Sequence, residues 1–295
     1  MTPIWTWTRR VALAATGACL LAAPAMADPS IWRVSDEDSD IYLFGTVHIL
    51  RADVEWRTPE VMAAFEAADT VYFEAPVNDP AQAAGMMPLV QQYGLNAAGE
   101  PLSSMLGDDG NAALARIAPE VGLSAAMLEP FRPWLASVTV TVQYISTQGY
   151  DPNSGVEAVL WPMASEAGKT LAYFETLEEQ LGFFGDLPRD IEVEMLEQTL
   201  DQIEDAPGML DGLVTAWANG DQATIDRLMN GEFREGSPEV YQVIIVDRNE
   251  RWVDDIQTLL DGSGTVFVAV GAGHLPGEQG VVNLLRAEGI TVEGP

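Results

Sequence analysis

The chain has 295 residues, of which 47% are hydrophobic, so it is long enough for one large or two small domains with a buried core. Its formal net charge is −31, and its one lysine, Lys169, and its scattered arginines do not form the basic surface that binding to nucleic acid requires. This acidity is typical either of a strongly solvated surface or of a protein that attracts cationic peptides.

The first 27 residues have the composition of an export signal. Arg9-Arg10 precede an apolar run from Val11 to Ala23, and small residues up to Ala27 resemble a cleavage site. We therefore expect cleavage after Ala27 and a periplasmic or secreted mature chain, whose net charge is −33 because two arginines and no acid leave. No later stretch approaches about 18 uninterrupted apolar residues, so no integral membrane segment is expected in the mature chain. The only cysteine, Cys19, lies in the signal, which excludes disulfides and thiol chemistry from the mature part.

Residues 28 to 79 favour a hairpin followed by a strand, helix and strand. "IWRV" and "DIYLF" are β-rich runs that the acidic turn "SDEDSD" separates. Thr58 and Pro59 have the pattern of a helix start, and we expect this helix to reach about Ala68. "TVYFE" then has the pattern of a buried strand.

The rest of the chain alternates long helical segments with single strands. Residues 80–165 carry helical periodicity, and only "SVTVTVQYI" at 137–145 favours a strand there. "TLAYFE" predicts a strand, residues 189–260 are again mainly helical, and "TVFVAV", a helix near residues 278–288 and "ITVEG" close the chain. We therefore predict a single α/β domain over residues 28–295. Its mainly parallel sheet is split along the sequence by helical insertions at 80–165 and 189–260.

Two histidines are the strongest functional candidates. His48 and His274 each lie three residues after a glycine at the end of a strand-like run, at Gly45 and Gly271. The alternative interpretation is chance placement beside ordinary strand-ending turns. Neutral imidazole is both a common metal ligand and a general base near neutral pH. Since the mature chain has no thiolate, a metal site would use nitrogen and oxygen ligands, which favours zinc, manganese, cobalt or iron.

Four predicted strands end in residues that bind metals or move protons. His48, Glu74, Glu175 and His274 follow "DIYLF", "TVYF", "TLAYF" and "TVFVAV". Ligands of parallel sheets bind beyond the carboxyl ends of the strands, so we expect these four side chains to converge. Two histidines and one glutamate are enough to hold a metal that keeps open positions for water.

The order strand, Gly-x-x-His, helix and strand ending in glutamate occurs twice, at residues 40–74 and 265–293. In this interpretation Glu293 corresponds to Glu74. Internal duplication is a hypothesis, because the spacing from histidine to glutamate differs between the two copies.

Five segments of the chain carry a resemblance to known proteins: "IWRVSDEDSDIYLFGTVHIL", "TVYFEAP", "SGVEAVLWPMASEAGKTLAYFETLEEQLGFF", "DRNERW" and "VFVAVGAGHLPGEQGVVNLLRAEGITV". Together they resemble the TraB/GumN family, which is related to the Tiki proteins. The paired Gly-x-x-His motifs and the Glu-Thr-x-x-x-Gln segment from Glu175 to Gln180 are specific as a set. The resemblance implies a metal-dependent hydrolase, or a protease of the kind proposed for Tiki proteins. Its central histidines and glutamate fall on His48, Glu74 and His274.

Three further residues are candidates for catalysis. Glu157 in "SGVEAVL" stands where a helix begins, where the helix dipole favours a carboxylate. It therefore either caps this helix or belongs to the site. Glu175 follows a strand and matches the family segment, which favours a role in the site over that of a solvated loop acid. Arg248 in "DRNERW" either binds a substrate carboxylate or holds Glu157 or Glu175 by an ion pair.

These observations favour an exported metal-dependent hydrolase, most of all a peptidase that acts on a peptide or protein substrate. In this hypothesis His48, Glu74 and His274 hold the metal, and Glu175 or Glu157 acts as general base. The alternative is a non-catalytic protein that binds a peptide or a metal outside the cytoplasm. A third interpretation is a purely structural periplasmic protein in which both histidines are replaceable.

Overall fold

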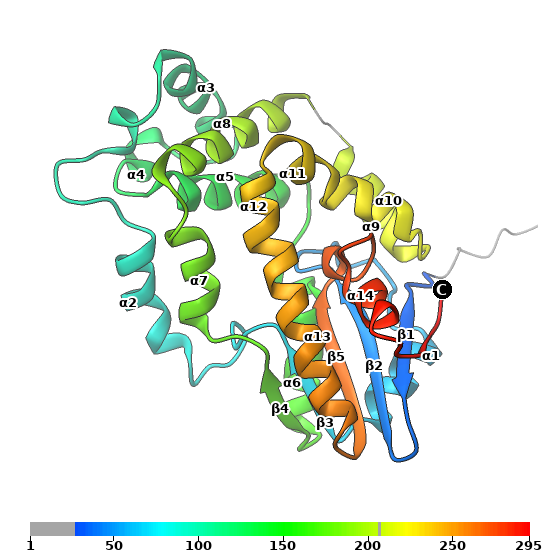
Figure 1. Cartoon of the computed structure of the whole chain (residues 1–295). Coiled ribbons are helices and arrows are strands. Elements are labelled where there is room, and N and C mark those ends of the chain that lie inside the picture. Colours follow the sequence, from blue (N-terminus) through cyan, green and yellow to red (C-terminus); the bar gives the residue numbers. More distant parts are fainter. Residues whose placement is uncertain (1–26, 206–207) are drawn as a thin grey trace, which may run out of the picture.

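A computed structural model describes residues 27–205 and 208–295 and contains a six-stranded mixed sheet in the order β4-β3-β5-β2-β1-β6 (Figure 1). Four neighbouring strands, β4, β3, β5 and β2, are parallel, while β1 is antiparallel to both β2 and β6. The strands are β1 Ile31–Ser35, β2 Ser39–Thr46, β3 Thr70–Phe73, β4 Thr170–Tyr173, β5 Gly264–Gly271 and β6 Val292–Glu293. The predicted α/β fold with a mainly parallel sheet is therefore confirmed. Apart from Ala27, the expected signal lies outside the described residues.

The first helix begins where the sequence predicts it. α1 (Pro59–Ala67) has Thr58 as its N-cap, and the side chain of Thr58 accepts a hydrogen bond from the amide of Val61 at 3.2 Å. A proline at the first helical position loses nothing, because that amide has no partner inside the helix.

Long helical segments separate β3 from β4 and β4 from β5. The first contains α2 Ala83–Tyr93, α3 Asp108–Glu120, α4 Ala125–Leu128, α5 Pro133–Thr147 and α6 Val156–Glu166, with 3₁₀ turns at Leu102–Ser104 and Pro152–Ser154. The second contains α7 Leu177–Gly185, α8 Arg189–Asp205, α9 Met209–Ala218, α10 Gln222–Met229, α11 Gly231–Gly236, α12 Pro238–Tyr241, a π-helical turn Gln242–Val246 and α13 Asp247–Leu260. A 3₁₀ turn Ala272–His274 and α14 Val281–Ala287 follow β5. Within 27–205 and 208–295, no helix has both the length and the apolar character that a membrane crossing needs.

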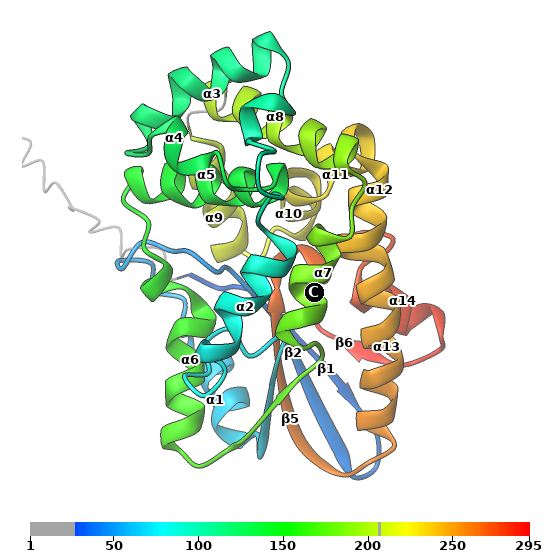
Figure 2. The ribbon, with the colours of Figure 1, turned by 90° about the vertical axis from the view of Figure 1, so that its left-hand side faces the viewer.

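The sheet is buried on both faces. In β5, Phe267 and Ala269 pack into one apolar cluster with α1, α6 and α9, while Val268 and Val270 pack into another with α13 and α14. Alternate residues of a strand point to opposite faces, so a central parallel strand needs apolar side chains at nearly every position. Figure 2 shows α1 and α6 on one side of the sheet and α13 on the other.

A second group of helices packs away from the sheet. α3, α4, α5 and α8 share an apolar cluster of their own, seen at the top of Figure 1. The run 137–145, whose β-branched residues favour a strand, lies in α5 instead. Ala136, Val140 and Tyr144 of α5 recur every four residues and pack into this cluster. Here tertiary packing overrides the intrinsic preference for a strand.

The structure does not confirm the internal duplication. From β2 the chain crosses β5 to reach β3, whereas from β5 it crosses β2 and β1 to reach β6 on the other side. Glu293 is exposed and pairs with Arg33 at 3.2 Å, whereas Glu74 is buried.

Candidate functional site

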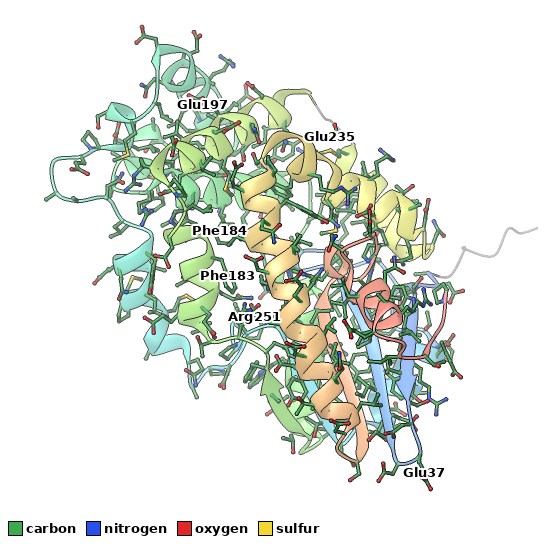
Figure 3. All side chains as sticks on the ribbon, viewed as in Figure 1. Glu37, Phe183, Phe184, Glu197, Glu235 and Arg251 are labelled. Carbon is green, nitrogen blue, oxygen red and sulfur yellow. The ribbon has the colours of Figure 1, made fainter. Side chains whose placement is uncertain are left out.

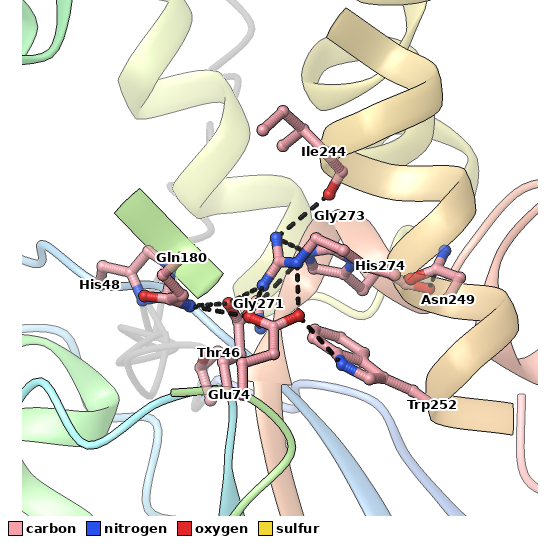
Figure 4. A network of polar contacts seen from close by, with 12 residues as sticks. Thr46, His48, Glu74, Gln180, Ile244, Asn249, Trp252, Gly271, Gly273 and His274 are labelled. Atoms are coloured by element: carbon pink, nitrogen blue, oxygen red, sulfur yellow. Dashed lines mark hydrogen bonds and ion pairs between the residues drawn. The ribbon is translucent and has the colours of Figure 1, made fainter. Parts of the chain in front are cut away.

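The carboxyl ends of the four parallel strands bring chemical groups together at one edge of the sheet (Figure 4). In the order β4-β3-β5-β2, these strands are followed by Glu175, Glu74, His274 and His48. Gly271 ends β5, and its amide donates to Glu74 Oε1 at 2.6 Å. Adjacent strand ends are therefore joined by a backbone to side-chain hydrogen bond.

Arg248 of α13 lies at the centre of this edge. Its Nε donates to Glu175 Oε1 at 2.7 Å, and its Nη2 donates to Glu175 Oε2 at 2.9 Å and to Glu74 Oε2 at 2.6 Å. Nη1 donates to the Ile244 carbonyl at 3.1 Å. Ile244 belongs to the π-helical turn that precedes α13, and such turns are frequent at functional sites. A planar guanidinium group satisfies two carboxylates at once, which an ammonium group does less well.

Glu175 is enclosed by donors. Trp252 Nε1 donates to its Oε1 at 3.1 Å, and Gln180 Nε2 donates to its Oε2 at 3.2 Å. The side chain of Phe183 in α7 faces α13 near Arg251 (Figure 3). The guanidinium groups of Arg248 and Arg251 each lie 5.3 Å from the centre of its ring. Burial raises the pKa of Glu175, although Arg248 opposes this effect. Only 3% of Glu175 is exposed. Its buried carboxylate, through two hydrogen bonds, fixes the position of the Arg248 guanidinium group.

Glu74 is ionised in this environment. Burial alone would raise its pKa, but Arg248, His274, His48 and the amide of Gly271 together lower it below the ordinary glutamate value. The carboxylate therefore carries a negative charge across the physiological pH range.

His274 is a neutral imidazole with a fixed orientation. Its Nδ1 lies 2.7 Å from Asn249 Oδ1, and its Nε2 lies 3.1 Å from Arg248 Nη1. Because arginine can only donate, Nε2 is the acceptor and Nδ1 carries the proton. Burial and then Arg248 lower the pKa of His274 to about 3. Asn249 also donates from Nδ2 to the carbonyl groups of His274 at 3.2 Å and Gln279 at 2.8 Å, which fixes the amide.

His48 has a comparable partner but a more open position. Its Nδ1 lies 2.8 Å from Glu157 Oε1, which also accepts a hydrogen bond from the Thr46 hydroxyl. The attraction of Glu157 raises the pKa of His48 to about 9. The side chain of His48 is 64% exposed, compared with 7% for His274. Gly155, which precedes α6, lies so close that a methyl group there would overlap the His48 carbonyl oxygen.

The three candidate metal ligands surround a small space beside Gly271. A methyl group on Gly271 would lie 3.0 Å from Glu74 Oε1, 3.5 Å from His274 Cδ2 and 3.6 Å from His48 Nε2. Both imidazoles have their Nδ1 held by an oxygen, which is the arrangement that outer partners impose on metal-binding histidines. As they stand, no three His, Cys, Asp or Glu side chains of the described part are arranged to hold a metal. Arg248 contacts Glu74 Oε2 and His274 Nε2. The donor set fits a metal in its chemistry, and binding would require the bond from Arg248 to His274 to open.

A cavity of about 350 Å³ adjoins this edge of the sheet. His48, Glu74, Asn78, Glu157 and Gln180 line it together with apolar side chains. Glu175, Arg248 and His274 lie behind these residues and are not part of the lining. A ligand in the cavity would therefore meet His48, Glu74 and Glu157 first.

The six residues singled out in the sequence belong to two linked groups. His274, Glu74, Glu175 and Arg248 form one buried network, and His48 with Glu157 forms a second group on the cavity. Arg248 pairs with Glu175 and Glu74, and not with Glu157.

Four participants were not anticipated in a site role. Asn249 directly follows Arg248, and Trp252 lies four residues after it on the same helix face. Gln180 ends the Glu-Thr-x-x-x-Gln segment, and Thr46 lies inside the first Gly-x-x-His motif. Each stands near a residue that the sequence did single out, but no pattern reveals its partner.

The fold and the site define an α/β protein with a polar network at the carboxyl ends of four parallel strands. The model of the TraB/PrgY/gumN family matches residues 30–294, so this chain belongs to that family. A similar curated protein is the uncharacterized protein YbaP of Escherichia coli (strain K12), 23% identical over 245 residues that cover 83% of this chain and 87% of YbaP. YbaP of Shigella flexneri gives the same values. An uncharacterized protein of Treponema pallidum (strain Nichols) is 21% identical over 270 residues, covering 86% of this chain and 79% of that protein. No solved structure matches.

Proposed function

We propose that this chain is an exported hydrolase of peptide bonds whose divalent metal ion, such as zinc, manganese or cobalt, is held by His48, Glu74 and His274. The observation that carries the proposal is the shared geometry of the two histidines. Each ring has its Nδ1 held by a side-chain oxygen, and both rings adjoin Glu74 around the space beside Gly271. The packing of an apolar core does not require two separate imidazoles, one buried and one on the cavity, to be oriented in this way.

A bound metal of this kind would polarise a carbonyl group and lower the pKa of a water molecule. Glu157 lines the cavity, so we assign the transfer of protons to it. Its Oε1 already accepts from His48 and Thr46, and Oε2 is therefore the atom that would take the proton from water and return it to the departing amine. Gln180 also lines the cavity, and its Nε2 donates to Glu74 Oε2 and to Glu175 Oε2 at 3.2 Å each, so we assign to it the positioning of both carboxylates.

Glu175 and Arg248 act in this proposal as positioning residues. Arg248 orients Glu74 and His274, and Glu175 holds Arg248 through two hydrogen bonds. Their burial behind the cavity supports this role over direct contact with substrate.

A non-catalytic peptide-binding protein is the second candidate function. The observation in its favour is that Arg248 already neutralises Glu74 and occupies His274 Nε2, which leaves a stable ion network without a metal. Stoichiometric capture of a peptide with no cleaved product would support this alternative.

The first test is the metal content of the purified protein. We expect about one metal ion per chain after equilibration with zinc, manganese or cobalt, measured by plasma mass spectrometry. The double variant His48→Ala, His274→Ala and the single variant Glu74→Gln should lose this metal. Glu293→Gln is the matched control, because Glu293 also lies at a strand end but is exposed and far from both histidines in the sheet.

Metal retained by the histidine double variant, or absent from the unmodified protein, contradicts the proposed ligand set. If metal binds as expected, cleavage of short peptides with that metal separates the hydrolase from the binding protein, and replacing Glu157 by Gln should abolish cleavage while metal stays bound.

A further inference from the structure

We infer that the cavity beside His48 receives one large apolar side chain, such as Leu, Met or Phe, next to the peptide bond that is cleaved. The inference rests on the proposed function and names its substrate class. The part of the cavity that carries it, here called the apolar recess, is lined by Ile49, Phe73, Val77, Val142, Ala158 and Trp161.

Four separate parts of the chain build the recess. Ile49 follows His48 after β2, Phe73 ends β3, and Val77 lies in the loop that follows Glu74. Val142 comes from α5, and Ala158 and Trp161 come from α6. Most residues of the recess lie within a few positions of His48, Glu74 or Glu157 in the sequence. The recess is therefore next to the polar groups of the proposed site.

The largest wall residue offers an apolar surface. The indole Nε1 of Trp161 donates to the Tyr173 hydroxyl at 3.0 Å, so its one polar atom is already satisfied within the protein. Tyr173 itself ends β4, next to Phe73 on β3, and this contact fixes Trp161 against the sheet. A rigid aromatic ring that has no remaining donor favours an apolar partner.

Val77 is an apolar residue exposed to solvent on this cavity, and a bound side chain would bury it. Its relative exposure is 57%, and it is one of only four large hydrophobic residues recorded as exposed in the described part of the chain. Scattered exposed apolar residues are ordinary, but Val77 lies on the same cavity as Trp161 and Val142. Occupation of the recess would cover it.

The apolar recess itself holds no charged side chain, because the charged residues that line the cavity are His48, Glu74 and Glu157. A substrate carboxylate inside the recess would lose its hydration without gaining an ion pair there, whereas an apolar side chain gains by leaving water. The volume of about 350 Å³ is near the lower limit of roughly 300 Å³ for small-ligand sites, which suits one side chain with its backbone.

The experiment measures binding and cleavage separately. The full chain is expressed, purified and given short peptides that differ only at one position, which is Phe, Leu, Ala or Asp. Binding is measured by calorimetry and cleavage by mass spectrometry. We expect the Phe and Leu peptides to bind at least roughly tenfold more tightly than the Ala peptide, and the Asp peptide to bind least.

Two variants fill the recess from different walls, Val142→Phe on α5 and Ala158→Leu on α6, and either should reverse the preference toward Ala. Met127→Phe is the control, because Met127 is 60% exposed and lies outside the cavity. Circular dichroism identifies any variant that does not fold, and the other variant then decides.

Equal binding of the Phe, Ala and Asp peptides, or an unchanged preference in a folded recess variant, overturns the apolar recess. Apolar preference in binding with no cleaved product supports the recess and contradicts the peptidase. Cleavage with no preference at this position does the reverse.

Discussion

The two Gly-x-x-His motifs place their histidines in opposite environments. His48 is mostly exposed on the cavity, and Glu157 raises its pKa to about 9. His274 is buried beside Arg248, and its pKa falls to about 3. The same local sequence therefore delivers one imidazole that is positively charged at neutral pH and one that is neutral. The motif sets where each ring stands along its strand, whereas the partner of each ring decides its charge.

The largest effect on stability is expected from removing Arg248, the cation of the buried network. Arg248→Met leaves Glu74 and Glu175 buried without a compensating charge, so we expect the free energy of unfolding to fall by about 3–5 kcal/mol. Urea unfolding measures this change. Arg251→Met is the control, because Arg251 is 46% exposed and its nearest approach to Glu175 is 3.6 Å, and a change within about 1 kcal/mol is expected. Equal losses in both variants would show that Arg248 is not the centre of the network.

The Asn249→Ala variant tests the orientation of His274. The change removes the acceptor for His274 Nδ1 and the donor to the His274 and Gln279 carbonyls, and we expect a loss of about 1–3 kcal/mol because Asn249 and His274 are buried. Loss of such an outer partner typically weakens metal binding by roughly 10- to 100-fold. Unfolding and metal titration are measured together, and unchanged metal affinity would separate Asn249 from the site.

Gly271→Ala tests the space between His48 and the buried pair of Glu74 and His274. The new methyl group would lie 3.0 Å from Glu74 Oε1 and would reduce the space between the histidines, so we expect weaker metal binding and destabilisation of up to about 1–3 kcal/mol. Gly182→Ala in α7 is the control, because its methyl group would meet only Asp186 at an ordinary 3.5 Å. Metal affinity that survives in Gly271→Ala would place the metal elsewhere.

The smallest effect on stability is expected at the pair of His48 and Glu157 on the cavity. Glu157→Gln removes the charge that raises the pKa of His48, so this pKa should fall toward the ordinary histidine value of about 6.5, as followed by NMR. Because the folded-state pKa of His48 is raised, its stabilising contribution is complete below about pH 6.5 and is lost as the pH rises toward 9. The His48 side chain is 64% exposed, so solvent screens its charge, and the variant should lose less than about 1 kcal/mol near neutral pH and flatten the alkaline decline.

His274 gives the opposite pH dependence. Its folded-state pKa is lowered, so its contribution to stability is complete above about pH 6.5 and is lost as the pH falls toward 3. Glu157→Gln should leave this acid decline unchanged. An equal effect of the variant on both declines would mean that the two histidines titrate as one unit.

Much of the fold could be predicted because its signals are local. The hairpin before His48, the N-cap at Thr58 and the apolar run of β5 each depend on a few neighbouring residues. The run at 137–145 misleads for the same reason, because α8 packs on its every-fourth-residue face and outweighs its β-branched composition. The partners of the site were harder to predict. Asn249 contacts His274 across a separation of 25 residues, and nothing local records that distance.

By itself the sequence determined that two histidines and two glutamates follow four strands, since strand ends are marked by short apolar runs and glycines. Parallel strands necessarily bring such residues to one edge. Only the tertiary structure decided that Arg248 joins Glu74, Glu175 and His274, and that His48 pairs with Glu157 on an open cavity. The physical reason is that burial and the nearest charge set the protonation and availability of each group. Both depend on helices far away in the chain that pack against that edge.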